Sequence, residues 1–210
     1  MSLLQIEIRN SSYDKKNIIL KKVDIKLNKH GLYFVSGRNG SGKSTLFKSL
    51  LGDIDVEVHK VDIDNTIIKK RSDKIVCIND EFVGYEFLKV KEYLVYISLL
   101  FNVKVTELMI TNLLSELELI DYNYKLIKDL SQGNKQKLAF VATIITNSEI
   151  ILFDEAFEHI DKYAMEVVKR KLTDLSNNHF IFLISHTRIL HELSNEELIV
   201  KDGEIHFESH

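Results

Sequence analysis

The sequence contains no proline and only one cysteine. The absence of proline has no explanation in the rest of the composition. The single cysteine, Cys77, excludes an internal disulfide framework and fits a reducing compartment. Cys77 lies in the apolar run of residues 75–78, so we expect it to be a buried strand residue rather than a reactive thiol.

A strong charge of either sign and a long apolar run are also missing. The chain has 28 Lys and Arg against 31 Asp and Glu, a formal net charge of -3, which gives no electrostatic reason to expect nucleic acid as a partner. The most apolar stretch, residues 93–101, is about half the length that spans a bilayer. The first residues, MSLLQIEIRN, lack the basic start of a signal peptide. We therefore expect a cytoplasmic chain that does not itself cross a membrane.

Repeats, low-complexity segments and linkers are absent, so the 210 residues are predicted to form one domain. Short apolar or alternating runs predict β-strands at residues 5–9, 18–27, 32–35, 75–78, 150–153 and 180–185. Apolar residues recur with helical spacing from residue 90 to about residue 130, and a mostly helical insert is expected over residues 85–145. The pattern predicts an α/β fold.

A glycine-rich segment follows the predicted strand at residues 32–35. It matches G-x-x-x-x-G-K-[ST] and precedes a predicted helix that ends near Gly52. The glycines let the backbone curl so that several N–H groups point at phosphate oxygens, and the helix N-terminus adds positive potential. Strand, loop and helix in this order predict a phosphate-binding loop. Its residues are Gly37, Arg38, Asn39, Gly40, Ser41, Gly42, Lys43, Ser44 and Thr45.

Four side chains in two segments are candidates for ATP chemistry. Lys43 would reach the β- and γ-phosphates, and the Ser44 hydroxyl would ligate Mg²⁺. Residues 150–155 read as an apolar strand that ends in Asp154 and Glu155. Asp154 would hold Mg²⁺ directly or through water, and Glu155 would act as the general base on the attacking water.

A further motif, LSQGNKQK at residues 130–137, opens another predicted helix. Alone, it is typical of a serine N-cap followed by a solvated basic turn. Its order, after the helical insert and shortly before the Asp–Glu strand, makes the chain resemble the ABC ATPase family from residue 4 to about residue 205. Ser131 and Gly133 resemble the family signature, usually LSGGQ, with Gln132 in place of the first glycine. The resemblance implies that this segment reaches across a dimer and caps the γ-phosphate bound to the partner's phosphate loop.

The same resemblance implies roles for other residues. Tyr13 stands in the place of the aromatic residue that stacks on adenine, and Asp161 in the place of the D-loop aspartate at the dimer seam. His186, after a predicted strand, resembles the switch histidine that contacts the γ-phosphate. The Q-loop glutamine is replaced: Asp80 aligns best with it and can ligate Mg²⁺, but an ionised carboxylate cannot donate a hydrogen bond as an amide can. Asn79 would supply that amide after a shift of one residue.

The resemblance implies a P-loop NTPase core with an N-terminal antiparallel β region and a helical subdomain, and it implies ATP and Mg²⁺ as cofactors. The implied partners are a separate membrane permease and a second nucleotide-binding domain, in a homodimer or a heterodimer. The chain would then lie in the cytoplasm, on the inner face of the cell membrane. The signature segment is more similar to those of bacterial exporters than to those of importers, so export is the expected direction.

Three other classes remain as alternatives. A non-transport ABC ATPase, acting as a mechanical or regulatory switch, would share every motif, although no sustained heptads indicate the long coiled coil of chromosome-organising heads. A P-loop kinase or transferase would leave Ser131 and His186 unexplained. A degenerate nucleotide sensor is favoured only by Asp80 at the Q-loop position.

Overall fold

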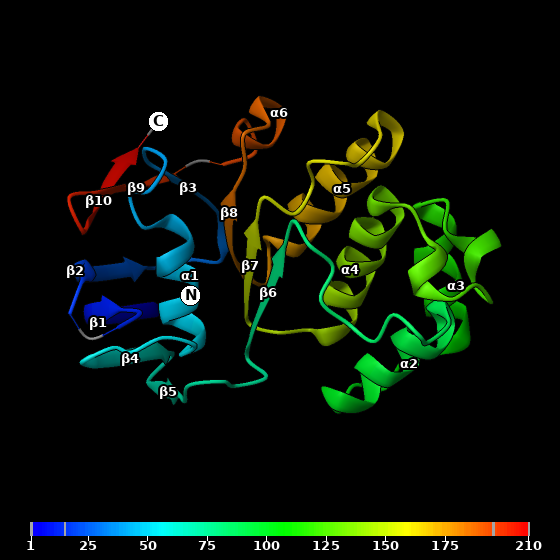
Figure 1. The fold of residues 1–210 in the computed structure, drawn as a ribbon, viewed down its shortest axis with the longest axis horizontal. Helices are drawn as coiled ribbons and strands as arrows, with labels where there is room; N and C mark the ends of the chain where they lie inside the picture. The colour runs from blue at the N-terminus through cyan, green and yellow to red at the C-terminus, as the bar shows by residue number, and fades with distance from the viewer. Residues whose placement is uncertain (1, 15, 195, 210) are drawn as a thin grey trace.

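The structure, a computed structural model, describes residues 2–14, 16–194 and 196–209. Within these residues ten strands form one curled sheet in the order β5-β4-β1-β2-β10-β9-β3-β8-β7-β6 (Figure 1). The strands are β1 (Leu4–Ser12), β2 (Ile18–Leu27), β3 (Gly31–Ser36), β4 (Val58–Ile63), β5 (Thr66–Ile68), β6 (Ile75–Asn79), β7 (Ile150–Asp154), β8 (Phe180–Ile184), β9 (Glu196–Lys201) and β10 (Glu204–Ser209).

One part of the sheet is parallel. Strands β3, β8, β7 and β6 are neighbours in that order, and each pairs in parallel with the next. Strands β7 and β8 are apolar along nearly their whole length because both faces of a parallel sheet are covered. Alternate residues of β7 point to opposite sides: Ile151 and Phe153 join the core beneath α4, whereas Ile150 and Leu152 join the core beneath α1.

The other part of the sheet is mainly antiparallel and includes four strands that the sequence patterns above did not identify. Strands β4 and β5 extend the β1–β2 hairpin, and β9 and β10 form a second hairpin beside β3. The β4–β5 and β9–β10 turns use positive backbone φ angles, at Asp64–Asn65 (50° and 67°) and at Asp202–Gly203 (53° and 81°). Asp, Asn and Gly favour such turns because they tolerate the left-handed region.

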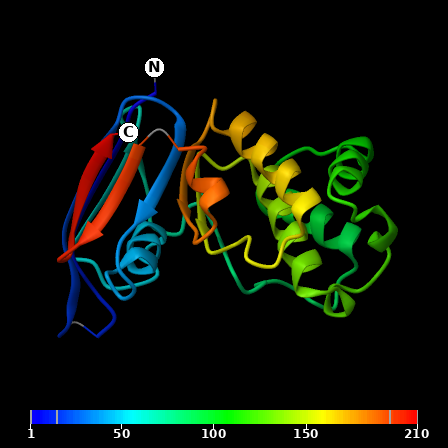
Figure 2. The ribbon, with the colours of Figure 1, turned by 90° about the horizontal axis from the view of Figure 1, so that it is seen from above.

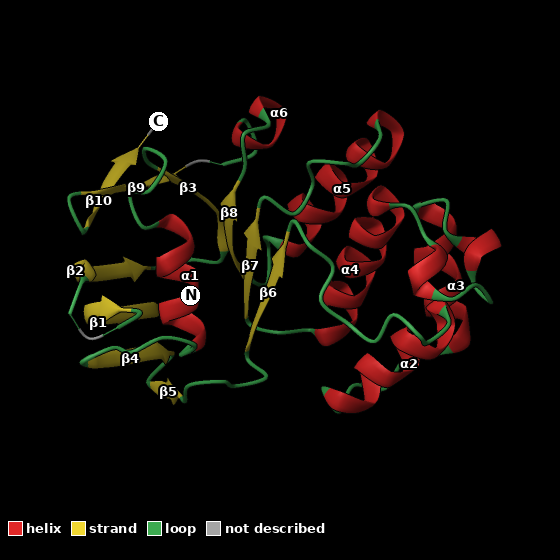
Figure 3. Cartoon of the chain, in the orientation of Figure 1, coloured by secondary structure: helices red, strands yellow, loops and turns green. Residues whose placement is uncertain are grey.

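The helices lie mostly on one side of the parallel strands (Figure 3). Figure 2 shows α2 and α3 at the opposite end of the molecule from the antiparallel strands. Two short 3₁₀ turns, residues Ile120–Tyr122 and Ile127–Asp129, connect α3 to α4. The helices are α1 (Lys43–Leu51), α2 (Val90–Leu100), α3 (Glu107–Glu116), α4 (Gln132–Thr146), α5 (Lys162–Leu175) and α6 (Arg188–His191).

The architecture is the mixed α/β fold expected from the sequence. The six predicted strands are present, and α1 ends at Gly52, whose φ of 77° provides the left-handed cap. Across the residues described above, no helix combines the length and apolar character that crossing a membrane requires. One expectation was partly wrong: Cys77 lies on β6 as predicted, but it is half-buried and lines a cavity.

Truncation of one core aromatic side chain tests this packing. Phe182 on β8 is fully buried, and its ring lies 5.8 Å from that of Tyr33, centroid to centroid. Phe182→Ala should lower the free energy of unfolding by about 3–5 kcal/mol because it leaves a cavity. Phe207→Ala is the matched control: Phe207 is 48% exposed, and the change should be near 0.5 kcal/mol. Urea denaturation measures both values, and equal values would contradict the described core.

Candidate functional site

Sheet register brings the motif segments to one edge. Asn79 on β6 lies opposite Asp154 on β7, and Asp154 lies opposite Ile184 on β8. Strand β3 pairs with β8 in the same direction, so the phosphate loop leaves the sheet at this edge too. The carboxyl ends of parallel strands are where ligands collect in α/β sheets. Segments from four separate parts of the sequence therefore meet in one place.

The phosphate loop has the backbone geometry that its glycines predict. Gly37 has φ of 143°, and a Cβ there would lie 2.5 Å from the Val200 carbonyl oxygen. Gly42, with φ of 107°, is the N-cap of α1. Lys43 begins α1 and folds back over the loop, where its Nζ donates to the Gly37 carbonyl at 3.0 Å and to the Arg38 carbonyl at 3.4 Å. The lysine amine and the N-terminus of α1, which has no side-chain cap among the described residues, thus both lie at the loop.

The remaining loop residues differ in exposure. Arg38, Asn39 and Gly40 are exposed at the tip of the loop, whereas Thr45 is buried in α1. Ser41 Oγ is a buried polar atom without a hydrogen-bond partner among the described residues, and such an atom is uncommon in folded proteins. The loop therefore has hydrogen-bonding capacity that its own chain does not use, as expected of a ligand-binding segment.

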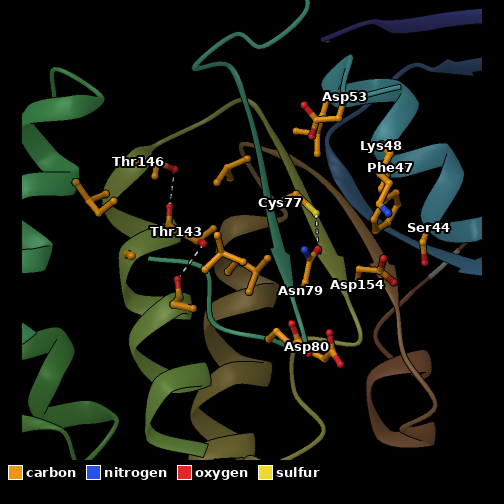
Figure 4. Close-up of a pocket in the computed structure, with 18 of the residues that line it drawn as sticks. Ser44, Phe47, Lys48, Asp53, Cys77, Asn79, Asp80, Thr143, Thr146 and Asp154 are labelled. Atoms are coloured by element: carbon orange, nitrogen blue, oxygen red, sulfur yellow. Dashed lines mark hydrogen bonds between the residues drawn. The ribbon is translucent and has the colours of Figure 1, made fainter. Parts of the chain in front are cut away.

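Ser44 and Asp154 form the candidate Mg²⁺ site. Burial raises the pKa of Asp154, the neighbouring carboxylates of Glu155 and Asp80 raise it further, and a hydrogen bond from Ser44 opposes the shift. Figure 4 shows Ser44 and Asp154 side by side, along a cavity of about 560 Å³ that Asp80 also lines. In the described part of the chain no three His, Cys, Asp or Glu residues form a complete cation site. The donor set fits a Mg²⁺ ion that also takes oxygens from phosphate and water.

Glu155 has a strained backbone. Its φ is 55°, in the left-handed region that glutamate rarely adopts, and its N–H donates to the Ile184 carbonyl at 2.9 Å. Such strain is often found at functional sites. The Glu155 carboxylate lies 3.1 Å from His186 Nε2, within hydrogen-bond distance, and both side chains are substantially exposed. An exposed carboxylate held by a histidine is accessible to water.

Tyr13 lies beside α1, and Asp80 lies near Asp154. Tyr13 is 52% exposed, and Lys48 Nζ from α1 lies 5.2 Å from its ring centroid, so the ring is next to the helix that begins at Lys43. Asp80 is exposed, and its charge acts on Asp154. Asn79 accepts a hydrogen bond from the Cys77 thiol at 3.3 Å, and burial raises the pKa of that thiol to about 12.

Ser131, Gly133 and Asp161 are engaged elsewhere. Ser131 is the N-cap of α4 and accepts from the Asn134 N–H at 3.3 Å. A Cβ at Gly133 would lie 2.5 Å from the His159 carbonyl oxygen, so glycine is needed there for packing within the chain. No hydrogen bond or ion pair among the residues described joins these three to the phosphate loop.

Asp161 also has a structural role. It is the N-cap of α5, where it accepts from the Ala164 N–H at 2.9 Å, and it pairs with the buried Lys137 at 3.3 Å. The backbone hydrogen bond and Lys137 together hold the pKa of Asp161 below its usual value. Lys137 was not singled out from the sequence because an apolar helix face gives no indication of a buried lysine.

Together the phosphate loop, the Ser44–Asp154 pair and Glu155 define a P-loop nucleotide-binding domain. The chain matches the ABC transporter family over residues 20–158. That match covers more than half of the sequence, so the chain belongs to the ABC transporter family, whose ATP-binding domains are ATPases.

Individual proteins agree with this assignment. A putative ABC transporter ATP-binding protein of Clostridium tetani is 34% identical over 97% of this chain and 48% of its own length. The energy-coupling factor transporter ATP-binding protein EcfA1 of Fusobacterium nucleatum is 27% identical over 98% of this chain and 81% of its own. A solved ATP-binding subunit of an ABC transporter has the same fold, with a TM-score of 0.85 at 20% identity over 99% of this chain and 90% of that one. The chain spans only 48% to 64% of the length of three curated relatives that it matches.

Removal of the Lys43 amine tests the phosphate loop. Lys43→Ala should weaken binding of a fluorescent ATP analogue by about tenfold or more, because a charge-assisted hydrogen bond to phosphate is lost. Lys60→Ala, at an exposed lysine on β4, is the control and should bind as the wild type does. Equal affinities of Lys43→Ala and the wild type would exclude this loop as the phosphate site.

Proposed function

We propose that this chain hydrolyses Mg-ATP and uses the energy to drive transport through a separate membrane permease. The observation that carries the proposal is the convergence of the phosphate loop, the Ser44–Asp154 pair and Glu155 at one sheet edge. Family membership supports the same activity.

The chemistry divides among a few side chains. Lys43 and the loop N–H groups would hold the β- and γ-phosphates, while Ser44 and Asp154 would hold Mg²⁺. A Mg²⁺ ion held there would supply positive charge against the charge that develops on the phosphates. Glu155 would accept the proton of the attacking water. His186, whose Nε2 lies 3.1 Å from the Glu155 carboxylate, would orient that carboxylate and contact the γ-phosphate. Asp80, which lines the same cavity as Ser44 and Asp154, would supply a further carboxylate oxygen to the metal.

Two nucleotide-binding domains would complete each site. Ser131 and Gly133 of one domain would cap the γ-phosphate held by the other, Asp161 would lie at the seam, and Tyr13 would stack on adenine. The intramolecular engagement of Ser131 and Asp161 supports this arrangement, because their helix-capping bonds fix both segments in place before a partner arrives. The pair is a homodimer or a heterodimer.

The permease would bind at residues 80–89, which join β6 to α2. This segment presents apolar side chains to solvent: Val83 and Phe87 are each 80% exposed, and Tyr85 is 61% exposed. Exposed apolar residues that cluster in this way are typical of a protein interface. Binding there would place the chain on the inner face of the cell membrane, in the cytoplasm.

Export is the proposed direction of transport, because the signature segment is similar to those of bacterial exporters. Transport itself is supported by the relative named as an energy-coupling factor transporter protein. A non-transport ABC ATPase that acts as a switch is the second candidate, and it would need no membrane partner at residues 80–89.

Blocking the proposed base should trap an ATP-bound dimer. Glu155→Gln should slow hydrolysis by roughly 10²-fold, the scale expected for loss of a general base, while ATP still binds. Light scattering with ATP and with ADP should then show a dimer only with ATP. Adding Ser131→Arg should abolish the dimer through a bulky side chain at the seam.

The control for that double variant is Glu155→Gln with Ser131→Ala, which loses the α4 cap, about 1 kcal/mol, without adding bulk. It would also lose the contact of Ser131 with the γ-phosphate, so it should dimerise more weakly than Glu155→Gln alone but more strongly than the Ser131→Arg variant. A Glu155→Gln protein that stays monomeric at saturating ATP, even when assembled with a permease, would contradict the proposal.

Charge placed on the exposed apolar segment should weaken membrane association. Val83→Asp with Phe87→Asp should reduce co-purification of the tagged chain with solubilised membrane proteins by about tenfold, since burying a carboxylate in an apolar interface is costly. Ile67→Asp, at a residue 64% exposed on β5, is the control and should leave co-purification unchanged. Glu86 is unsuitable for such a test because it pairs with Lys135 inside the chain.

Nucleotide binding must be unchanged in both proteins. Equal co-purification of the double variant and the control would show that residues 80–89 do not bind the permease. It would favour the second candidate, a non-transport ABC ATPase that acts as a switch.

A further inference from the structure

The first turns of α4 hold the segment that joins β6 to α2, residues 80–89, here called the junction loop. Gln132 Nε2 donates to the Asp80 carbonyl oxygen at 2.9 Å, and Gln136 Nε2 donates to the same oxygen at 3.2 Å. The two glutamines are four residues apart, so they lie on one face of the helix. A carbonyl oxygen has two lone pairs and can accept both hydrogen bonds at once.

Gln136 has a second partner on a different loop. Its Oε1 accepts from the His159 N–H at 2.9 Å, in the segment between Glu155 and α5. Gln136 is only 2% exposed, so water cannot readily replace either bond. One buried side chain therefore joins the loop after β6 to the loop after β7.

The partners fix the orientation of the Gln136 amide. A backbone N–H can only donate and a backbone carbonyl can only accept. If the amide were flipped, its NH₂ group would face the His159 N–H and its oxygen would face the Asp80 carbonyl, and neither pair could form a hydrogen bond. The bridge thus requires an amide. A carboxylate could keep the bond from His159 but could not donate to Asp80.

We propose that Gln132 and Gln136 form an amide clamp on the Asp80 main chain and that, through it, Gln136 is a positioning residue that couples the junction loop to the segment of Glu155. The usual signature has glycine at the position of Gln132. The hydrogen bond from Gln132 to the Asp80 carbonyl therefore depends on the glutamine that this chain has there. Lys135, between the two glutamines, pairs with Glu86 and ties the same loop to α4.

The clamp has a mechanical consequence. Asp80 lies at the start of the junction loop, and its carboxylate acts on Asp154, while Val83 and Phe87 lie further along and face solvent. A partner that moves the loop must shift or break the clamp, and the Gln136–His159 bond passes that movement to the loop that carries Glu155. The effect of the clamp on ATP turnover rests on the proposed function, whereas the hydrogen bonds that form the clamp do not depend on it.

Hydrogen exchange of the junction-loop amides tests the clamp without any activity. Gln132→Ala removes the outer donor, and Gln136→Glu removes the inner donor while keeping the acceptor for His159. Each single variant keeps one donor and should raise exchange by about twofold, whereas the double variant should raise it by more than tenfold. An increase in exchange rate larger than the product of the two single increases is expected when two donors share one acceptor. Additive or unchanged exchange would overturn the clamp.

The wild-type protein supplies a measurement that no folding defect can affect. The chain has three glutamines, Gln5, Gln132 and Gln136. Side-chain amide protons of Gln132 and Gln136 should exchange with solvent at least about tenfold more slowly than those of Gln5, which lies on β1 away from the clamp. Equal rates for all three would overturn the proposal.

Steady-state ATP turnover tests the coupling. The double variant should lower kcat by about tenfold and change nucleotide Kd by less than about twofold, because the phosphate loop is untouched. Faster loop exchange with unchanged kcat would contradict the positioning role. A wild-type protein that turns over no ATP, even with a permease, would refute the proposed function, while the exchange measurements would still decide the clamp.

Discussion

The site depends on the parallel register of β3, β8, β7 and β6. Side-by-side pairing aligns the ends of these strands, and each end is followed directly by a polar segment. A shift of one residue in β7 would turn Asp154 to the opposite face of the sheet and separate it from Ser44. The buried apolar residues of β7 and β8 fix the register because both faces are packed, one against α1 and the other against α4.

This alignment gathers negative charge. Burial of Asp154 makes its ionised form less favourable, and the nearby carboxylates of Glu155 and Asp80 add to that cost. Lys43 offsets part of that charge, and a divalent cation would offset more. A cation bound beside Asp154 would therefore favour the ionised form of this carboxyl.

The residues around that centre hold the loops in place. Ser131 and Asp161 cap α4 and α5, Gly133 allows α4 to approach the His159 carbonyl, and Gln136 bridges two loops. The signature segment therefore has a structural function within the chain as well as the proposed function across a dimer. The proposed function would draw on the same geometry, because the capping bonds hold the segment in place within its own chain.

The sequence predicted most of the parallel strands, the phosphate loop and the strand that ends in Asp154 and Glu155, because these segments carry strong local patterns. The β9–β10 hairpin was missed although Asp202–Gly203 is a turn signal between two alternating runs. The partners of Gln136, the burial of Lys137 and the half-buried state of Cys77 depend on contacts between distant segments, which no local pattern encodes.

The most direct measurement is a crystal structure of the chain with Mg²⁺ and a non-hydrolysable ATP analogue. We predict that Lys43 Nζ leaves the Gly37 carbonyl and contacts the β- and γ-phosphates, and that the Ser44 hydroxyl ligates the metal, with Asp154 binding it directly or through water. The γ-phosphate should lie within one water molecule of Glu155. A nucleotide bound away from the phosphate loop, or a metal that contacts neither Ser44 nor Asp154, would contradict the assignment of this sheet edge as the ATP site.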